Sequence, residues 1–469
     1  MIVKERREEF LSYLEDASNF REGSAEILYI PENEEEVVEV VKEAVDKKLP
    51  LTISGAGTGT VGGRIPTRGG IISLEKLNRI KEIDRKRNRA VLEAGVIIED
   101  FLKILEKEGF FYPPFPTERK AFIGGNVATN ASGEYSFRFG CTRKYVRRIK
   151  LVTSKGEVWE VERGRFKADC DGIIRWEKGD IQIPAYISPP IKNSAGYFSQ
   201  PGMDFIDLFI GSEGTLGVIT EVEVEIIPSL PARFIGIAFF KERKILEAVA
   251  RIKEEGKLHP YCLEYFDDTS LSLLRMDFPS IPQSVREALY WEDEEKRLED
   301  WAEFLDEFSP LDVWISTSEK EYRSLIEFRH LLPEKVNEKF RKLGSHKIAL
   351  DIAVPEENFP KLFSYYLEVK KKVDGVIFGH IGENHLHFNL FPTRKGIEKI
   401  YEEAIQKGLE LGGTVSAEHG IGKTKRRFLE IMYGKKGIEE MIRVKKEIDP
   451  YLIFGPDNLF PYERLLNSA

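Results

Sequence analysis

Cysteine is scarce in this chain, and the few cysteines lie far apart. Cys141, Cys170 and Cys262 are the only three among 469 residues. They form neither a CxxC pair nor the closely spaced run that holds an iron–sulfur cluster. Disulfides and protein-bound clusters are therefore not expected.

Long apolar segments and an excess of basic charge are also missing. No run of 18 or more apolar residues occurs, and the opening MIVKERREEF lacks the apolar stretch of a signal peptide. The chain has 70 Lys and Arg residues and 79 Asp and Glu residues, which gives a formal charge of −9. These features predict a cytoplasmic protein without a transmembrane segment, attached to a membrane at most through a partner. Nucleic-acid binding is not expected as its main role.

The chain length and the succession of strand-like and helix-like segments predict an α+β protein with more than one domain. A hydrophobic content of 42% is enough for well-filled cores, and a chain of 469 residues suggests two to four domains. Residues 1–229 are rich in glycine and short strands. From 230 to 412, strand-like runs such as FIGIAFF and KIALDIAV alternate with charged helices, which predicts a ferredoxin-like domain with an antiparallel sheet. Residues 413–469 return to glycine-rich loops and are expected to pack back on the first domain. No internal repeat is visible.

A glycine-rich loop, SGAGTGTVGGRIP at 54–66, contains the spacing G-x-G-x-x-G at Gly57, Gly59 and Gly62. As a dinucleotide fingerprint it would have to open a helix, which Gly63 and Pro66 prevent. Successive backbone N–H groups without side chains favour an anion-binding loop instead. A plain glycine turn is the alternative.

Three of the seven histidines lie within GHIGENHLHFN at 379–389. A hairpin with a two-residue turn at Glu383-Asn384 would make His380 and His387 cross-strand neighbours, close enough to share a metal ion. His385 would share a face with His387, but we expect it to be an ordinary hydrogen-bonded residue and not a required ligand.

A second polar motif, SAEHGIG at 416–422, places Glu418 beside His419 between glycines. Adjacent side chains of an extended segment point to opposite sides, so one of the two can bind a metal while the other faces a substrate. Two histidines and one glutamate with an open position form a known catalytic metal arrangement.

Two further segments share the glycine-rich character of the first loop. They are FPTERKAFIGGNVATNASGEYSFRFGCTRKYVRRIKLVTSKG at 115–156 and DLFIGSEGTLGVITEVEVEIIP at 207–228. In order and spacing, the three segments resemble the FAD-binding domain of vanillyl-alcohol-oxidase-type flavoproteins, in particular the glycolate oxidase and D-lactate dehydrogenase branch. The resemblance covers nearly the whole chain.

The resemblance implies FAD and a set of residues that bind it. These are Gly55, Ala56, Gly57, Thr58, Gly59, Gly62 and Gly63 in the first segment, Pro116, Gly124, Gly125, Asn126, Thr129, Asn130, Gly133, Arg138, Gly140 and Thr142 in the second, and Glu213, Gly214, Gly217, Val218 and Ile219 in the third. Residues 51–70 contain no histidine or cysteine to which FAD could be linked, so non-covalent FAD is implied. Near the C-terminus the family has Asn-Pro-Gly-Lys, whereas FGPDNLF carries Gly455 in place of the Asn. Whether Asn458 substitutes for it stays open.

The metal-dependent D-2-hydroxyacid dehydrogenases of the same family share a pattern close to G-H-x-G-D-G-N-L-H, followed later by E-H-G-I-G. By that resemblance His380, His387 and Glu418 are metal ligands and His419 is the catalytic base. Glu383, Asn384 and His385 replace the Asp, Gly and Asn of the pattern. Zinc is the expected metal, and these ligand types are also compatible with manganese or iron.

The segment YRSLIEFRHLLPEKVNE at 322–338 resembles the family segment in which an arginine binds the substrate carboxylate. The matching residue here is Arg329, and a solvated helix arginine is the alternative.

The implied function is a FAD-dependent, metal-assisted dehydrogenase that oxidises a small D-2-hydroxy acid of the lactate, glycolate or 2-hydroxyglutarate class to the 2-oxo acid, with hydride transfer to flavin N5. Two alternatives remain: a metal-independent FAD oxidoreductase acting on another alcohol, and a flavin subunit that relays electrons in a larger complex. A separate acceptor is expected, namely an iron–sulfur subunit, an electron-transfer flavoprotein or a quinone. The sequence leaves open which acid is used, the oligomeric state, and whether Lys192, Tyr197, Lys347 or His385 take part.

Overall fold

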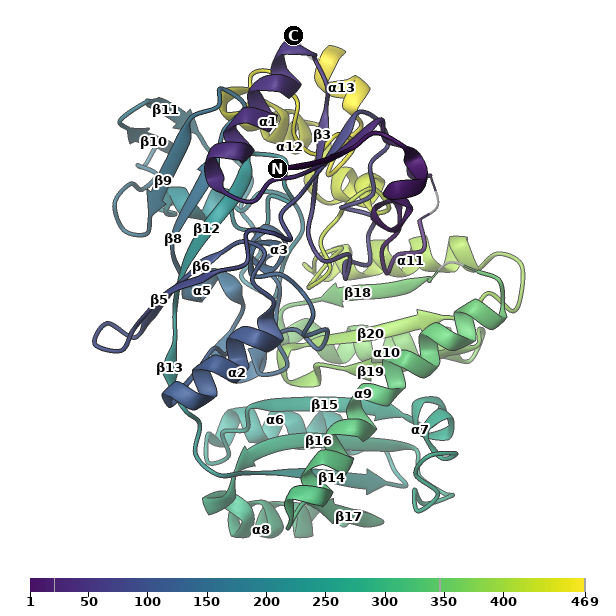
Figure 1. Ribbon diagram of the computed structural model, residues 1–469. Helices are drawn as coiled ribbons and strands as arrows, with labels where there is room; N and C mark the ends of the chain where they lie inside the picture. Colours follow the sequence, from purple (N-terminus) through teal and green to yellow (C-terminus); the bar gives the residue numbers. More distant parts are fainter. Residues whose placement is uncertain (21, 346, 468–469) are drawn as a thin grey trace.

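The computed structural model describes residues 1–20, 22–345 and 347–467 and has the predicted α+β architecture (Figure 1). The N-terminal part begins with a four-stranded sheet of order β1-β2-β4-β3. Its strands are β1 (Ile2–Lys4), β2 (Ile27–Ile30), β4 (Gly70–Ser73) and β3 (Leu51–Ser54). Helix α1 (Glu34–Asp46) connects β2 to β3; the Asn33 side chain caps it, and Val37, Val40 and Val41 are buried.

A second, five-stranded antiparallel sheet has the order β5-β6-β12-β8-β9. It comprises β5 (Ile80–Asp84), β6 (Arg89–Glu93), β12 (Val218–Glu225), β8 (Val146–Val152) and β9 (Val158–Glu162). The central strand β12 is buried along nearly its whole length. The helices α2 (Ile98–Glu108), α3 (Ile123–Thr129), α4 (Ser136–Phe139) and α5 (Thr142–Tyr145) and the short strands β7 (Phe110–Phe111), β10 (Ile173–Trp176), β11 (Gly179–Gln182) and β13 (Ile227–Pro228) complete this part.

The central part contains a seven-stranded antiparallel sheet of order β17-β14-β16-β15-β19-β20-β18. Its first half is β14 (Arg233–Phe240), α6 (Ile245–Glu255), β15 (Cys262–Asp267), α7 (Asp268–Leu274), β16 (Glu287–Glu294), α8 (Leu298–Phe308) and β17 (Asp312–Ile315). The order of the four strands in the sheet, fourth-first-third-second, is the ferredoxin-like order that the alternation of strands and helices predicts. Helix α9 (Glu319–Lys342) then crosses the sheet (Figure 1).

The second half of this sheet repeats the first in topology. It consists of β18 (Ala349–Ala353), α10 (Phe359–Lys370), β19 (Gly375–Gly379), β20 (His385–Leu390) and α11 (Ile397–Glu410), and it joins the first half through the β15–β19 pair. Among the described residues this second unit has no fourth strand. The repeat was not visible in the sequence because the two halves share strand order and not a residue pattern.

The C-terminal segment runs along β18, where the fourth strand would lie. Thr414 N donates to Ala353 O at 3.0 Å, and Ala417 N donates to Asp351 O at 2.8 Å. The chain then continues through α12 (Arg426–Ile448) and α13 (Tyr462–Asn467) at the N-terminal part (Figure 1). There Leu51 N donates to Ile453 O at 2.6 Å, beside β3. This segment therefore contacts the seven-stranded sheet at β18 and the four-stranded sheet at β3. It carries Glu418 and His419 to the edge of β18.

Within the described part of the chain, no helix combines the length and hydropathy needed to cross a membrane.

Candidate active site

The glycine-rich segments meet around a cleft with about 1040 Å³ of empty space. From the sequence-predicted set it is lined by Gly55, Ala56, Gly57, Thr58, Gly59, Gly63, Gly124, Gly125, Asn126, Thr129, Glu213, Gly214, Gly217 and Ile219. Asp16, Arg64, Ser212 and His419 line it as well. All three segments therefore contribute to one site, although they are up to about 160 residues apart in the chain.

Small residues keep this cleft open. A Cβ atom added at Gly55, Gly59 or Gly125 would meet no atom within 4 Å, so any side chain there would project into free space. Gly57 has φ +81°, a conformation that favours glycine, and a Cβ there would lie 2.5 Å from the Arg64 guanidinium. The cleft therefore fits a large cofactor that approaches the backbone closely, as FAD does.

Other predicted flavin residues do not line this cleft; they are Gly62, Pro116, Asn130, Gly133, Arg138, Gly140, Thr142 and Val218. Several have structural partners elsewhere. Arg138 forms an ion pair of 2.9 Å with Glu294 of the seven-stranded sheet and lies over the ring of Tyr261. Gly133 packs against the backbone of Phe115, where a Cβ would be only 2.7 Å from the nitrogen. Such residues shape the second segment and join it to the neighbouring sheet.

Asn458 clamps two of the cofactor segments together. Its Nδ2 donates to Gly63 O at 2.9 Å and to Glu213 O at 3.0 Å, and its Oδ1 accepts from Lys423 Nζ at 2.6 Å. The Glu213 carboxylate in turn accepts from the backbone of Ile421 and Gly422, both at 2.7 Å. Burial raises the pKa of Glu213 to about 7. The C-terminal segment is thus fixed to the cleft at two neighbouring points.

The histidine hairpin forms, but its predicted register was wrong. His387 pairs with Phe378 and not with His380. His380 follows the end of β19, and a single 3-10 turn at Ile381–Glu383 leads to Asn384 in the left-handed region. The connection therefore spans five residues, 380–384, instead of the two-residue turn expected from spacing. Because the shift is an even number of residues, His387 keeps its face and its ring still lies near that of His380, with centroids 5.5 Å apart.

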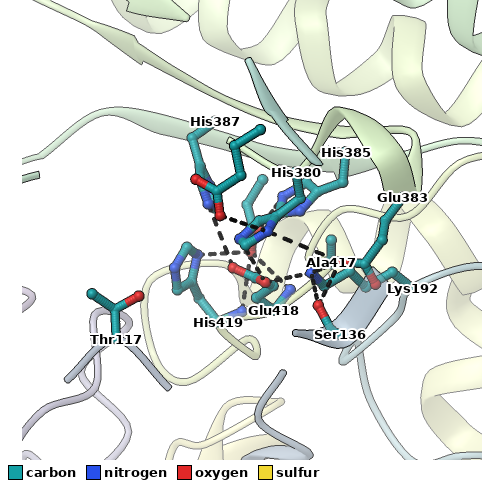
Figure 2. Close-up of polar contacts among 12 residues, drawn as sticks. Thr117, Ser136, Lys192, His380, Glu383, His385, His387, Ala417, Glu418 and His419 are labelled. Atoms are coloured by element: carbon teal, nitrogen blue, oxygen red, sulfur yellow. Dashed lines mark hydrogen bonds and ion pairs between the residues drawn. The ribbon is translucent and has the colours of Figure 1, made fainter. Parts of the chain in front are cut away.

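Four side chains of the hairpin and the C-terminal segment converge in one cluster (Figure 2). His380 Nε2 lies 3.1 Å from Glu418 Oε1, and His387 Nε2 lies 3.4 Å from Glu418 Oε2. Together with His385, they place one ligand atom each within 4.8 Å of the others. Imidazole and carboxylate groups at this spacing suit a first-row divalent metal, so the predicted ligands His380, His387 and Glu418 fit such an ion.

The surroundings favour the metal-binding protonation state of His387 and Glu418. For His380, burial would lower the pKa, but the charge of Glu418 outweighs it and raises that pKa. Burial lowers the pKa of His387 to about 4, so its ring is neutral near pH 7. Burial alone would raise the pKa of Glu418, but the charges of His380 and Lys192 outweigh it and hold that pKa well below its usual range. Lys192 Nζ lies 2.5 Å from Glu418 Oε1 and 2.7 Å from Glu383 Oε2. Lys192, which the sequence left open, therefore belongs to this site.

Asp351 on β18 holds the predicted base. Its Oδ2 lies 2.9 Å from His419 Nδ1 and accepts from Ser416 Oγ at 2.8 Å and Lys425 Nζ at 3.2 Å. Its Oδ1 lies 2.9 Å from His385 Nε2. An ionised carboxylate can only accept, so His419 presents Nδ1–H to it and its Nε2 is left for proton transfer.

His419 also stands between two cavities. It lines the glycine-rich cleft and a second cavity of about 2190 Å³ of empty space, and Val61 is the other residue common to both. The second cavity is lined by apolar groups such as Tyr401 and Phe428 and by several cations. Lys347 is one of them; burial lowers its pKa to about 8. No carboxylate forms an ion pair with it among the described residues. A molecule in the second cavity can therefore meet His419 and a cation at once.

Arg329 lies beside the histidine cluster but lines neither cavity. Its side chain is 7% exposed, and its Nε and Nη2 donate to Glu264 Oε1 at 2.8 and 2.5 Å. Its Nη1 lies 3.1 Å from Glu134 Oε1 and donates to Thr117 Oγ1 at 3.2 Å. Glu264 Oε1 is also 3.6 Å from His380 Nδ1. The guanidinium fork is thus engaged by two carboxylates of the protein.

Sequence reasoning missed Asp351 and Glu264, although each carries a signal. Both are single charges within apolar strand sequences, IALDIAV and YCLEYF, where a charge has to be buried and paired. Tyr197, also left open, is fully buried and bonded to Thr215 Oγ1 at 2.7 Å, so it lies outside the cluster.

Comparison with known families agrees with this geometry. Residues 25–162 match the FAD binding domain family, and residues 231–459 match the family of FAD linked oxidases, C-terminal domain. Solved structures of alkyldihydroxyacetonephosphate synthase share the fold; one has a TM-score of 0.64 at 14% identity and covers 97% of this chain and 82% of its own. The chain therefore belongs to the FAD-linked oxidases, which are flavin-dependent oxidoreductases.

Relatives place the chain in one branch of this family. The glycolate oxidase subunit GlcD of Bacillus subtilis is 28% identical, with 96% of this chain and 92% of the relative covered. D-lactate dehydrogenase of Anaerostipes hadrus is 30% identical, with 92% and 89% covered. D-2-hydroxyglutarate dehydrogenase of Stutzerimonas stutzeri is 28% identical, with 92% and 90% covered. The predicted branch is confirmed.

The Asn458 clamp predicts a measurable coupling between cofactor binding and stability. Asn458→Ala removes the two hydrogen bonds that Nδ2 donates and the one that Oδ1 accepts from Lys423, and it leaves Glu213 O unpaired among the described residues. The loss should lower the free energy of unfolding by roughly 1–3 kcal/mol and weaken FAD binding. Urea unfolding and FAD titration check this. Asn337→Ala, at an exposed position of α9, is the control and should change neither quantity. An Asn458→Ala protein with unaltered FAD affinity would show that the clamp does not support the cleft.

Proposed function

We propose that this protein is a FAD-dependent, metal-assisted dehydrogenase that oxidises a small D-2-hydroxy acid to the 2-oxo acid. The observation that carries the proposal is the position of His419, which lies between the cofactor cleft and a second cavity, is held by Asp351, and follows directly after Glu418 of the metal cluster. The names of the relatives, which include glycolate oxidase, D-lactate dehydrogenase and D-2-hydroxyglutarate dehydrogenase, support the substrate class.

Two cofactors would supply chemistry that side chains lack. Non-covalent FAD, held by the glycine-rich loops, would supply the acceptor for the hydride from C2. A divalent metal, zinc first and manganese or iron as alternatives, would be held by His380, His387 and Glu418 and would supply Lewis-acid polarisation of the C2 hydroxyl oxygen.

The protein's own residues handle the proton. His419 Nε2 takes the proton of the C2 hydroxyl, because Asp351 fixes the tautomer in which this nitrogen has its lone pair free. Asp351 then stabilises the imidazolium across the 2.9 Å contact, since its buried negative charge faces the new positive one. Lys425, on the same carboxylate, balances its charge before the proton arrives.

Two cations are candidates for holding the substrate carboxylate. The family pattern assigns this role to Arg329, whose planar guanidinium suits a carboxylate. At least one of its two hydrogen bonds to Glu264 would have to break for a substrate to bind there. Lys347 faces the second cavity without a carboxylate partner among the described residues. We propose that both contribute.

The electrons are proposed to leave through a separate iron–sulfur subunit, an electron-transfer flavoprotein or a quinone, because the chain carries neither a dinucleotide-binding helix after its glycine loop nor a cysteine run. A metal-independent oxidoreductase and a flavin relay subunit are the rival functions.

The decisive experiment is anaerobic mixing of the FAD-loaded protein with D- and L-2-hydroxy acids while the visible flavin absorption is followed. We expect bleaching by a D-acid, and bleaching about 10²–10⁴-fold slower in His419→Ala, the usual contribution of a general base. Lack of reduction by any hydroxy acid would favour the relay subunit. Reduction at the wild-type rate in His419→Ala would remove this residue as the base.

For the metal ligands, we expect His380→Ala and His387→Ala each to lose bound metal and most turnover while retaining FAD. The reason is that the flavin cleft is lined by other segments and shares neither residue. Metal content by mass spectrometry and flavin content by absorbance test this, with exposed His259→Ala as the control. Full activity in metal-free protein would support the metal-independent rival.

For the carboxylate anchor, Arg329→Lys and Lys347→Gln should each raise KM, since losing a charge-assisted contact costs on the order of 1.5–3 kcal/mol. Steady-state kinetics with a D-hydroxy acid measures the effect. Arg341→Gln, an exposed cation of the same cavity, should change KM little. If KM changes only in Lys347→Gln, Arg329 is not a substrate contact.

A further inference from the structure

One buried ring nitrogen in the histidine cluster makes no hydrogen bond within the described part of the chain. The His385 side chain is 0% exposed, and its Nε2 lies 2.9 Å from Asp351 Oδ1. Its other ring nitrogen, Nδ1, is buried without a hydrogen-bond partner among the described residues. Buried polar atoms of this kind are rare in folded proteins and call for an explanation, such as an ion that the side chain binds.

The hydrogen bond between His385 and Asp351 determines which ring nitrogen of His385 is free to bind a metal ion. The carboxylate can only accept, so the proton of the neutral His385 ring resides on Nε2 and Nδ1 keeps its lone pair. A histidine whose second nitrogen donates to a carboxylate is the usual arrangement of a metal-ligating imidazole. His385 therefore has the tautomer and the outer partner of a ligand.

The ring positions agree with a shared ion. The His385 centroid lies 4.6 Å from that of His387 and 5.5 Å from that of His380. A ring centroid lies about 3.2 Å from an ion bound at about 2.1 Å, so two rings on one tetrahedral ion have centroids about 5 Å apart. One ring nitrogen of each of the three histidines and one oxygen of Glu418 lie within 4.8 Å of one another. The centroid separation of each ring pair is therefore close to the one that a shared ion requires.

We propose that His385 is a fourth protein ligand of the metal and binds it through Nδ1, next to His380, His387 and Glu418. This inference rests on the proposed metal site, and it revises the expectation from the sequence that His385 is an ordinary hydrogen-bonded residue. The pattern that this chain otherwise resembles has Asn at the position, so the ligand is a feature of this chain.

Two consequences follow for the chemistry. Three imidazoles and one carboxylate form a ligand set richer in nitrogen, which favours zinc and cobalt over metals that prefer oxygen, such as manganese or magnesium. Asp351 also becomes a direct link between the metal and the base, because its Oδ1 bonds to the ligand His385 and its Oδ2 to His419.

The rival explanation is that His385 only supports Asp351. Two substitutions separate the roles. In His385→Gln the side-chain amide reaches the position of Nε2 and can still donate to Asp351, whereas Nδ1 is lost. In Asp351→Asn the ring of His385 keeps Nδ1, whereas the charge of its outer partner is lost. His387→Ala serves as the reference for loss of a ligand.

The experiment uses FAD-loaded protein stripped of metal by a chelator, followed by competition titration with Zn²⁺ and Mn²⁺ and by the visible spectrum of the Co²⁺-loaded protein. We expect His385→Gln to weaken Zn²⁺ binding more than 100-fold, to lose less affinity for Mn²⁺, and to change the Co²⁺ bands. Asp351→Asn should weaken Zn²⁺ binding only about 10–100-fold, the usual effect of an outer-shell partner, with the Co²⁺ bands retained.

The opposite results overturn the proposal. Zn²⁺ affinity of His385→Gln within tenfold of wild type and an unchanged Co²⁺ spectrum would show that His385 is not a ligand. If His387→Ala also keeps its metal, the proposed metal site itself fails, and the two failures are thereby distinguished. Should His385→Gln not fold, nitrogen NMR of histidine-labelled wild-type protein decides: Zn²⁺ should shift one Nδ1 and two Nε2 signals, whereas shifts of Nε2 signals alone would refute the proposal.

Discussion

The buried carboxylate of Asp351 is the interaction on which the site depends. It accepts from His385 of β20, from Ser416 and Lys425 of the C-terminal segment, and from His419. An unpaired charge in this interior would be strongly unfavourable, so the strand, the hairpin and the C-terminal segment have to meet around it. The same charge decides the tautomers of two histidines. One residue thus fixes both the local packing and the direction in which His419 can take a proton.

Buried charge also joins the two halves of the molecule. Glu134 precedes α4 in the N-terminal part, and its carboxylate meets Arg329 of α9 at 3.1 Å. Arg329 continues to Glu264 of β15, which lies 3.6 Å from His380. A chain of three paired charges therefore runs from the cofactor-binding part to the histidine cluster. Such pairs tolerate little displacement, because a shifted partner leaves a buried charge uncompensated. The cleft and the cluster are held in a fixed relation, which the proposed role of His419 as a base between two cavities requires.

The topology explains why the site lies at β18. Two ferredoxin-like units share one sheet, and in the part of the chain that the structure describes the second unit has no fourth strand. A regular strand in that position would pair along the whole of β18 and would alternate its side chains between the two faces of the sheet. The C-terminal segment instead makes only a few backbone bonds with β18 before it turns at Gly420, where φ is +77°. This irregular edge lets Glu418 point to the histidines while His419 remains 33% exposed between the cavities.

The sequence by itself determined the α+β class, and the spacing of its polar motifs predicted that His380, His387 and Glu418 could share a metal ion. These follow from the alternation of strand side chains and from local spacing, which can be read along the chain. The flavin-binding residues and the role of His419 as base were implied by the resemblance to a known family, through motifs rich in glycine where backbone approaches a ligand. Only the tertiary structure decided the hairpin register, because a 3-10 turn and the left-handed Asn384 lengthen the connection without changing the face of His387. It also decided the partners of Arg329 and the role of Asp351. Arg329 meets a glutamate 195 positions away, and Asp351 meets a histidine 68 positions away. Pairings between buried charges follow from packing in three dimensions, and no local pattern in the sequence encodes which charge meets which.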